Sequence, residues 1–331
     1  MISEALVVDA PNSIRFTQVE VPEPTANQVL VEAAYSCVSP GTEIRYLKDQ
    51  NSFASGFPYV PGYAMAGTVI KAGAESGYQP GARVFCGGTD ACSVSTQWGA
   101  HIRFAVRDAA KLVPVPDHVS LLDAAVAKLG AIAHRGTVVA GACQGKRVGV
   151  VGLGPIGQLS ARIFHAKGAD VCCGDIQEGR IALLKELGIK TVNTRQGVLA
   201  AFAQAGHDQC DIVVDATGVP ALIPQNIELA RDKPWDESLC DGAIYLVQGS
   251  YPTSFAIPYH EAFVKELSFR LPRDSQLHDL RAVIQLVAEG RMTVRDLMGR
   301  VAKPSEVVDV FNELMQPNCP YLTAAFDWSQ V

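Results

Sequence analysis

Short runs that alternate apolar and polar residues fill the first third of the chain. They lie at residues 5–8, 14–19, 29–35, 67–71, 83–86 and 102–106, and prolines and glycines separate them. Alternation at this spacing predicts a compact, barrel-like β domain, because successive side chains of a strand point to opposite faces. The period becomes helical after Ser120, which predicts a first helix from there and a second over 131–140.

Strands and helices then alternate through the second half of the chain. Apolar runs at 147–151, 170–175, 191–193, 211–215, 244–247 and 267–271 predict strands, and helical segments lie between most of them. This order favours a doubly wound parallel sheet with helices on both faces, so the fold class is α/β. Helices at 277–289 and 304–315 and a strand at 322–327 follow. We therefore expect a β domain at 1–131, a parallel-sheet domain at 132–273, and a return to the first domain at 274–331.

The sequence VGVVGLGPIG at 148–157 carries the clearest chemical signal. A buried strand ends in Gly152-x-Gly154-x-x-Gly157, a helix follows, and Asp175 closes the next strand. The first glycine suits a tight turn, the second admits a pyrophosphate against the backbone, and the third lets the helix pack closely. Unpaired N–H groups at the helix N-terminus favour the pyrophosphate charge. The motif predicts a dinucleotide site.

Composition narrows the class of protein. The chain has 331 residues, 48% hydrophobic and 19% charged, with a net charge of −6. This length favours two domains, and the negative charge argues against a nucleic-acid surface. We expect a cytoplasmic protein without membrane spans, since no signal-peptide pattern opens the sequence and the nine cysteines are scattered and odd in number.

Several segments together resemble the medium-chain dehydrogenase/reductase (alcohol dehydrogenase-like) superfamily along essentially the whole chain. They are VLVEAAYSCVSPGTE, PYVPGYAMAGTVIKAG, GARVF, VGVVGLGPIGQLSARIFHAKGA, LLKELG and DIVVDATG. The resemblance implies a GroES-like β-barrel catalytic domain before a Rossmann domain, and a hydride-transfer reaction. Substrate and nicotinamide would meet between the two lobes.

The resemblance fails at the zinc ligands. Where zinc-dependent members carry cysteine, histidine and a later glutamate or cysteine, this chain has Ser39, Tyr63 and Ala127. A hydroxyl or a methyl group does not replace thiolate and imidazole as zinc donors. Only Cys86 and Cys92 lie where a structural zinc lobe would need four cysteines. We predict a zinc-free member that binds no metal.

Within the superfamily, residues 39–43 and 289–328 are similar to the bacteriochlorophyllide a dehydrogenase group, whose members oxidise a hydroxyethyl substituent to an acetyl group. This similarity supports a zinc-free secondary-alcohol dehydrogenase more strongly than it supports a tetrapyrrole substrate.

NAD is the predicted cofactor. The Asp175 carboxylate would accept hydrogen bonds from the adenosine ribose, and its charge would repel the 2′-phosphate of NADP. Arg180 is the counter-argument, because a nearby cation offsets that repulsion; it has an alternative role as a helix residue facing solvent or stacking on adenine. The predicted cofactor contacts are Gly152, Gly154, Pro155, Ile156, Gly157, Asp175, Arg180, Ala216, Thr217, Gly218, Val247, Gln248 and Gly249.

Without zinc, another group must polarise the carbonyl and move the alcohol proton. Tyr63 is the first candidate, with Lys128 as a cation that lowers the pKa of its phenol; a tyrosine that only fills the vacated metal position is the alternative. Thr42 matches the hydroxyl relay of the zinc enzymes. Glu43 is a further candidate, or it pairs with Arg45 or caps a helix. Lys128 is otherwise the solvated end of its helix.

Ser39, Trp98 and His101 are the predicted substrate contacts, with a place on the barrel surface as the alternative for His101. We expect a small-molecule substrate, a secondary alcohol on a sugar, a cyclitol or a larger metabolite, and a homodimer formed through the edge strand at 267–271. Two other functions remain open: an NADPH-dependent, zinc-free enone or quinone reductase, and a dinucleotide-binding protein that has lost catalysis.

Overall fold

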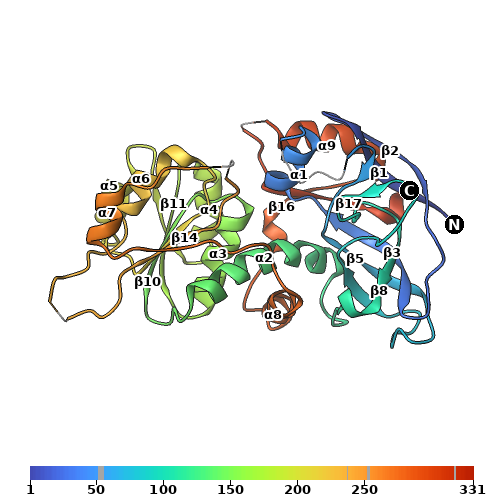
Figure 1. The fold of residues 1–331 in the computed structure, drawn as a ribbon, viewed down its shortest axis with the longest axis horizontal. Helices are drawn as coiled ribbons and strands as arrows, with labels where there is room; N and C mark the ends of the chain where they lie inside the picture. Colours follow the sequence, from blue (N-terminus) through green and yellow to red (C-terminus); the bar gives the residue numbers. More distant parts are fainter. Residues whose placement is uncertain (51–55, 237, 252–253, 317) are drawn as a thin grey trace. The chain divides into compact units, whose positions relative to one another are not determined.

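The computed structural model describes residues 1–50, 56–236, 238–251, 254–316 and 318–331 (Figure 1). The chain forms two compact units, one of Met1–Lys128 with Leu280–Val331 and the other of Leu129–Asp279. Both boundaries fall inside helices rather than in loops, and the first lies within α2 (Leu121–Ala140). We expected two helices there, and the structure has a single one of 20 residues. In the part of the chain that is described, no helix is long and apolar enough to cross a membrane.

The first unit, called here the catalytic unit, is built from two sheets. One has the strand order β2-β1-β4-β7, and the other has the order β16-β17-β3-β5-β6-β9 with β8 also paired to β3. The strands are β1 (Ile2–Ala10), β2 (Ser13–Glu20), β3 (Gln28–Cys37), β4 (Tyr59–Val60), β5 (Met65–Ala72), β6 (Arg83–Cys86), β7 (Ser95–Thr96), β8 (Phe104–Asp108), β9 (Val113–Pro114), β16 (Met298–Ala302) and β17 (Thr323–Asp327).

The core of the catalytic unit lies between these sheets. Alternate residues of β1 and β3, such as Leu6, Val29 and Val31, are fully buried there with Trp328 from the C-terminal segment. The return of the chain into this unit is therefore part of its core. Helices α1 (Pro40–Leu47) and α9 (Val307–Leu314) belong to the same unit, while α8 (Leu277–Ala288) spans the second boundary.

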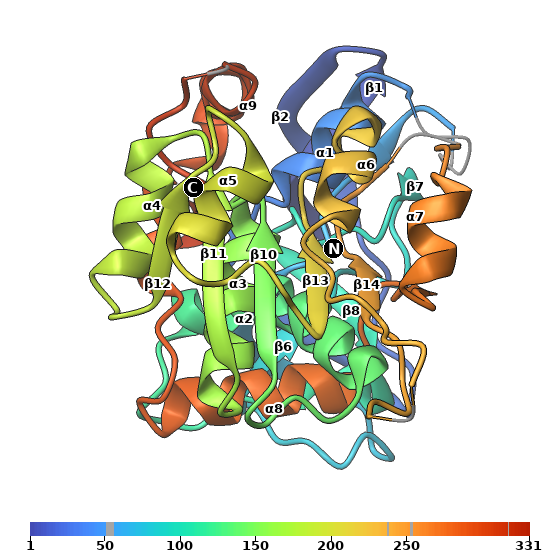
Figure 2. The ribbon, with the colours of Figure 1, turned by 90° about the vertical axis from the view of Figure 1, so that its left-hand side faces the viewer.

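The second unit, called here the Rossmann unit, has one sheet with the order β12-β11-β10-β13-β14-β15, in which every pair is parallel. Figure 2 shows β12, β11, β10 and β13 side by side in this order. The strands are β10 (Arg147–Val151), β11 (Asp170–Asp175), β12 (Lys190–Asn193), β13 (Ile212–Asp215), β14 (Ile244–Val247) and β15 (Ser268–Arg270), and the helices are α3 (Pro155–Ala166), α4 (Glu178–Lys185), α5 (Val198–Gln204), α6 (Ile223–Ile227) and α7 (Tyr259–Val264).

Both faces of this sheet are covered, as the apolar runs predict. Val148 and Val150 of β10 pack with Phe164 of α3 in one core cluster. Val151 and Cys172 pack in a second cluster with Phe202 of α5. Because neighbouring positions of a strand point to opposite faces, a strand buried on both sides reads as the continuous apolar run seen in the sequence.

Helix α1 and strand β16 are among the elements that were not expected from the sequence. Helix α1 begins with Pro40 and Gly41 and is only eight residues long, yet it buries Glu43, Tyr46 and Leu47. Strand β16 pairs in parallel with β17. Tertiary packing stabilises such short elements against weak intrinsic propensity.

Candidate active site

The glycine turn of the Rossmann unit has the geometry that a dinucleotide requires. Gly152 has φ +88°, and a Cβ on it would lie 2.9 Å from the amide nitrogen of Thr217. A Cβ on Gly157 would lie 1.8 Å from the Gly152 carbonyl oxygen, so α3 packs directly on the turn. A Cβ on Gly154 would meet nothing within 4 Å. Gly154 caps α3 without a side-chain hydrogen bond, and Pro155 and Ile156 follow it in the first turn. This open helix N-terminus fits a pyrophosphate.

Parallel register brings the other predicted cofactor residues to the same edge of the sheet. Val151 is aligned with Gly174 of β11 and with Asp215 of β13, and Asp215 is aligned with Val247 of β14. The segments that follow these strands therefore leave the sheet together, at the edge where open α/β sheets bind ligands. They hold Asp175, Ala216, Thr217, Gly218, Val247, Gln248 and Gly249.

Gln248 differs from the expectation. Its side chain is 8% exposed, its amide donates to the Ile132 carbonyl at 2.9 Å, and a Cβ on Gly136 would lie 2.0 Å from its Oε1. The side chain thus packs on α2, and the N–H groups of Gln248 and Gly249 both donate to the Asp215 carbonyl, at 2.8 and 2.9 Å. Gly249 is in close contact with Gly218, since a Cβ on it would lie 2.6 Å from the Gly218 nitrogen.

Asp175 is more constrained than the sequence suggests. It is 6% exposed, its Oδ2 accepts the Leu153 N–H at 2.6 Å, and its Oδ1 accepts the Gln177 N–H at 2.9 Å. The carboxylate thereby ties the glycine turn to the end of β11. Each oxygen has a second lone pair, so the group can still accept a ribose hydroxyl. The guanidinium of Arg180 lies 3.7 Å from Oδ2 and balances part of its charge.

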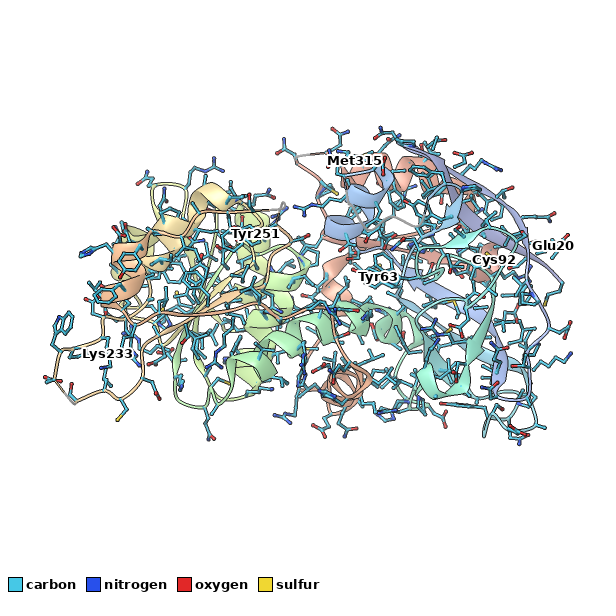
Figure 3. All side chains as sticks on the ribbon, viewed as in Figure 1. Glu20, Tyr63, Cys92, Lys233, Tyr251 and Met315 are labelled. Atoms are coloured by element: carbon cyan, nitrogen blue, oxygen red, sulfur yellow. The ribbon has the colours of Figure 1, made fainter. Side chains whose placement is uncertain are left out.

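In the catalytic unit, the hydroxyl groups of Ser39, Thr42 and Tyr63 lie close together. Ser39 and Tyr63 stand at two of the positions where the resemblance expects zinc ligands. Tyr63, labelled in Figure 3, lies on the loop between β4 and β5. It donates its hydroxyl hydrogen to Ser39 Oγ, and its oxygen lies 3.4 Å from Thr42 Oγ1. Ser39 is the N-cap of α1, and Thr42 lies in its first turn. The sequence places these residues up to 24 positions apart, and folding brings them together.

Lys128 and Trp98 flank the Tyr63 ring. The Lys128 ammonium, in α2, lies 5.5 Å from the ring centroid, in the range of a cation–π contact. Trp98 meets the same ring edge-on at a centroid distance of 5.0 Å, and it contacts Tyr46 at 5.0 Å as well. Trp98 is 37% exposed and has φ +68°, a conformation that is uncommon for a bulky residue and is concentrated at functional sites.

Glu43 and His101 have surroundings different from those expected. They bond to each other through Glu43 Oε2 and His101 Nε2 at 2.7 Å, and their side chains are 1% and 0% exposed. Neither side chain has surface to offer a substrate, so we withdraw Glu43 as a proton-transfer group and His101 as a substrate contact. Glu43 Oε1 accepts the Ser39 N–H at 2.7 Å, so its carboxylate caps α1, which is one of the alternative roles expected for it.

Two further members of this buried cluster carry no signal in the sequence. Ser36 Oγ lies 2.8 Å from His101 Nδ1 and accepts the Trp328 indole N–H at 2.9 Å. Ser36 and Trp328 are 292 positions apart, and only the return of the chain into the catalytic unit joins them.

Cys37 is the cysteine nearest to Ser39 in the sequence. Cys37, two positions before Ser39, is 0% exposed, and burial raises the pKa of its thiol to about 12. Among the described residues, no group of three His, Cys, Asp or Glu side chains is arranged to hold a metal ion. All nine cysteines are free thiols.

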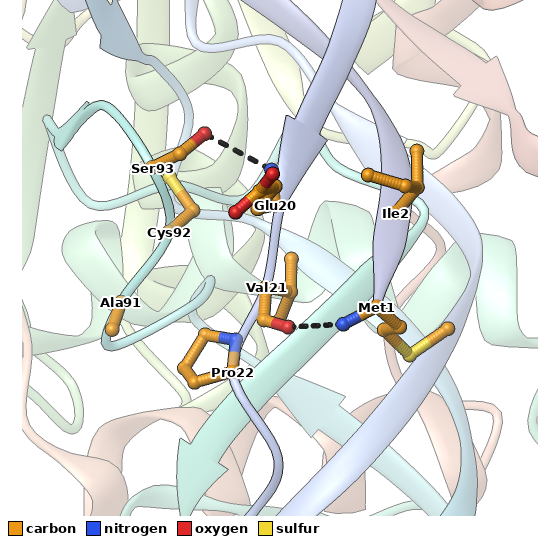
Figure 4. A pocket seen from close by; sticks show the side chains of 8 residues that line it. All are labelled: Met1, Ile2, Glu20, Val21, Pro22, Ala91, Cys92 and Ser93. Carbon is orange, nitrogen blue, oxygen red and sulfur yellow. Dashed lines mark hydrogen bonds between the residues drawn. The ribbon is translucent and has the colours of Figure 1, made fainter.

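A separate pocket of about 530 Å³ lies at the open end of the β1–β2 hairpin (Figure 4). Its walls include Met1, Ile2, Val21 and Pro22, with Glu20 and Cys92 as its titratable groups. Burial raises the pKa of the Cys92 thiol, which disfavours the nucleophilic thiolate. The pocket lacks the convergent polar groups of the Tyr63 site, so we do not assign the reaction to it.

Both units of the chain are similar to known dehydrogenases. Residues 25–117 match the family model of the alcohol dehydrogenase GroES-like domain, and residues 155–234 match that of the zinc-binding dehydrogenase. The 2-desacetyl-2-hydroxyethyl bacteriochlorophyllide A dehydrogenase of Cereibacter sphaeroides is 27% identical, with 99% of each chain covered. Sorbitol dehydrogenase of Gallus gallus is 28% identical over 80% of each chain. The crystal structure of 2R,3R-butanediol dehydrogenase from Bacillus subtilis superposes with a TM-score of 0.83 at 18% identity, covering 98% of this chain and 99% of that one.

The chain belongs to the alcohol dehydrogenase-like medium-chain dehydrogenase/reductase family. It is an oxidoreductase acting on CH–OH groups, with a dinucleotide-binding Rossmann unit. Within the family it is similar to the bacteriochlorophyllide dehydrogenases, as the sequence motifs indicate.

Proposed function

We propose that this protein is a zinc-independent, NAD-dependent dehydrogenase that interconverts a secondary alcohol and its ketone. The observation that carries the proposal is the hydrogen bond from Tyr63 to Ser39, at two positions where the resemblance expects zinc ligands. A phenol held by a serine hydroxyl and flanked by an ammonium is a proton-transfer unit, and it can do part of what a metal ion does elsewhere in the family.

The chemistry assigns one role to each residue. With substrate bound, the Tyr63 hydroxyl hydrogen turns from Ser39 Oγ to the ketone oxygen and is donated to it as that oxygen gains negative charge. In the other direction, Tyr63 first releases its own proton to water, and the phenolate then accepts the alcohol proton. Ser39 and Thr42 orient the phenol by hydrogen bonds. Lys128 stabilises the phenolate. A bound nicotinamide would supply or accept the hydride.

NAD is proposed over NADP because Asp175, at the end of β11, would accept the ribose hydroxyls and repel a 2′-phosphate, with its charge only partly balanced by Arg180. Gly152, Gly154 and Gly157 would hold the pyrophosphate at the N-terminus of α3. The substrate we propose is a secondary alcohol on a larger metabolite, in line with the hydroxyethyl compound named for the Cereibacter relative. The free thiols support a reducing compartment such as the cytoplasm.

Metal-depleted protein tests the proposal directly. With NAD and a panel of secondary alcohols that includes polyols and hydroxyethyl-substituted aromatic compounds, we expect NADH absorbance to appear without added zinc. Activity that returns only with zinc would overturn the zinc-independent mechanism. Tight NAD binding without turnover of any alcohol or ketone would indicate a protein that has lost catalysis. Tighter binding of NADPH, together with reduction of enones, would indicate the reductase instead.

We also propose a homodimer formed through the free edge of the Rossmann sheet. Strand β15 is the last in the strand order, and Leu271 directly after it is 63% exposed. An exposed edge strand with apolar neighbours is a template for pairing with a second copy. Light scattering on Leu271→Lys should show a shift toward monomer, whereas Val308→Lys, at a site 51% exposed in the catalytic unit, should leave the mass unchanged. A wild-type monomer would contradict this proposal.

A further inference from the structure

We infer that the buried pair of Glu43 and His101 is a positioning device for the Ser39–Tyr63 hydroxyl pair, and that the bond at His101 Nε2 is the part on which turnover depends. This inference rests on the proposed function of Tyr63. Glu43 and His101 have no access to substrate, and in this inference they act through Ser39 and Tyr63.

The pair holds Ser39 from one side. Glu43 Oε1 accepts the Ser39 N–H at 2.7 Å, while Oε2 bonds to His101 Nε2 at 2.7 Å. The carboxylate thus fixes the backbone of Ser39, whose hydroxyl oxygen accepts the hydrogen bond from Tyr63. Glu43 lies in α1, one turn after Ser39, so rotation of its side chain would break the hydrogen bond from the Ser39 N–H at the start of the helix.

His101 holds Tyr63 from the other side. Its backbone N–H donates to the Pro61 carbonyl at 3.0 Å, and the Ala100 N–H donates to the Gly62 carbonyl at 2.9 Å. Gly62 has φ +84°, and a Cβ on it would lie 2.6 Å from His101 Cδ2, so the imidazole packs directly on the residue before Tyr63. The two halves of the hydroxyl pair therefore rest on one imidazole–carboxylate contact.

Donor counting orients the whole buried cluster. The Trp328 indole can only donate, and it donates to Ser36 Oγ. The Ser36 hydroxyl hydrogen is then available for His101 Nδ1, which leaves the Nε2 hydrogen for Glu43. In this arrangement each of these buried groups has its complement, which is the condition under which a polar network fixes a single geometry.

The two ring nitrogens allow a matched experiment. Glutamine places an amide near the position of Nε2 and asparagine near that of Nδ1, so His101→Gln keeps a donor for Glu43 and His101→Asn keeps a partner for Ser36. Each variant retains one buried hydrogen bond and loses the other. A purely structural histidine would respond to both substitutions in the same way.

We expect kcat for a secondary alcohol to stay within about threefold of wild type in His101→Gln and to fall on the order of tenfold to 10²-fold in His101→Asn, because a catalytic group misplaced by about 1 Å loses rate on that scale. KM and NAD affinity should change little in either variant. Glu43→Gln replaces His101→Asn in this experiment if that variant does not fold. It removes the charge of the carboxylate but keeps an acceptor for the Ser39 N–H. The kcat of Glu43→Gln should also fall at constant KM.

A second readout does not need turnover. The ultraviolet difference titration of wild type against Tyr63→Phe isolates the Tyr63 phenol. A hydrogen bond donated by the neutral phenol resists ionisation, so loosening it in His101→Asn should lower the titration midpoint, whereas His101→Gln should keep it. Equal behaviour of the two variants in kcat and in titration would overturn the positioning role. If the titration midpoint falls in His101→Asn and not in His101→Gln, but no alcohol is turned over, the positioning role is retained and the proposed function is rejected.

Discussion

The hydroxyl of Tyr63 donates a hydrogen bond to Ser39, which is the N-cap of α1, a helix that was not predicted from the sequence. Tyrosine stands where the family's zinc enzymes have histidine, and serine stands where they have cysteine. At these two positions the structure has a hydrogen bond between two hydroxyl groups. The predictions below test what that hydrogen bond does.

Tyr63→Phe should lower kcat by a factor on the order of 10² to 10⁴, because it removes the proposed acid–base group without changing the shape of the ring. NAD binding, followed by fluorescence, should be unchanged. Tyr78→Phe is the matched control, since Tyr78 is also a partly buried tyrosine of the catalytic unit. A Tyr63→Phe enzyme as active as this control would eliminate Tyr63 as the proton-transfer group.

Lys128→Met should move the pH at which alcohol oxidation becomes half-maximal upward, by about one pH unit, since a cation 5.5 Å from the phenol ring favours the phenolate. The rate of alcohol oxidation is measured from about pH 6 to about pH 10. Lys111→Met removes an ammonium that is 50% exposed and paired with Asp90, and it should leave the profile in place. An identical shift in both variants would point to net charge alone.

Chelation should leave the enzyme active. Dialysis against a strong zinc chelator is expected to reduce kcat by less than about twofold, because Ser39, Tyr63 and Ala127 offer no thiolate, imidazole or carboxylate to a metal. Elemental analysis of the same sample gives the metal content. Loss of activity that zinc restores would show that another set of ligands is in use.

Asp175→Asn should weaken the discrimination against NADP. The amide keeps an acceptor for the turn at Leu153 but removes the charge that repels a 2′-phosphate, and Arg180 is then free to attract it. We expect the ratio of NAD to NADP affinity to fall on the order of tenfold or more. Asp170→Asn, at the opposite end of β11, is the control. Unchanged selectivity in Asp175→Asn would assign the choice of cofactor to other residues.

Stability should decline as the pH falls below neutral. Burial lowers the pKa of both His207 and His134 from the usual value of about 6.5, so the unfolded chain binds more protons than the native chain between the lowered values and 6.5. The stabilisation is fully present above about pH 6.5 and is lost as the pH falls through the folded-state values.

Urea unfolding between pH 8 and pH 5, about three units, measures this effect. His207→Gln keeps a donor for the Val148 carbonyl and removes one titrating group, so the pH dependence should become shallower. The exposed His118→Gln is the control. If stability is flat with pH in the wild-type protein, the lowered pKa values are wrong.

The glycine turn, its strand and its helix were predictable because their signals are local. A strand buried on both faces has to be continuously apolar, Gly152 requires a backbone conformation that few residues adopt, and Gly157 excludes a Cβ outright. In the structure, parallel register places the residues after β13 and β14 at the same edge of the sheet as the turn. The family resemblance assigned Tyr63 and Ser39 to positions at which zinc-dependent members have metal ligands.

What the sequence alone determined is the alternation of strands and helices in the Rossmann sheet and its glycine turn. Only the tertiary structure decided the roles of Glu43 and His101. They are 58 positions apart, and neither periodicity nor spacing pairs a carboxylate with an imidazole from another part of the chain. Their burial removes them as candidates for contact with substrate and leaves them the supporting role that we propose. Pairings of this kind depend on which side chains meet in a folded core, and a single sequence records only the residue types.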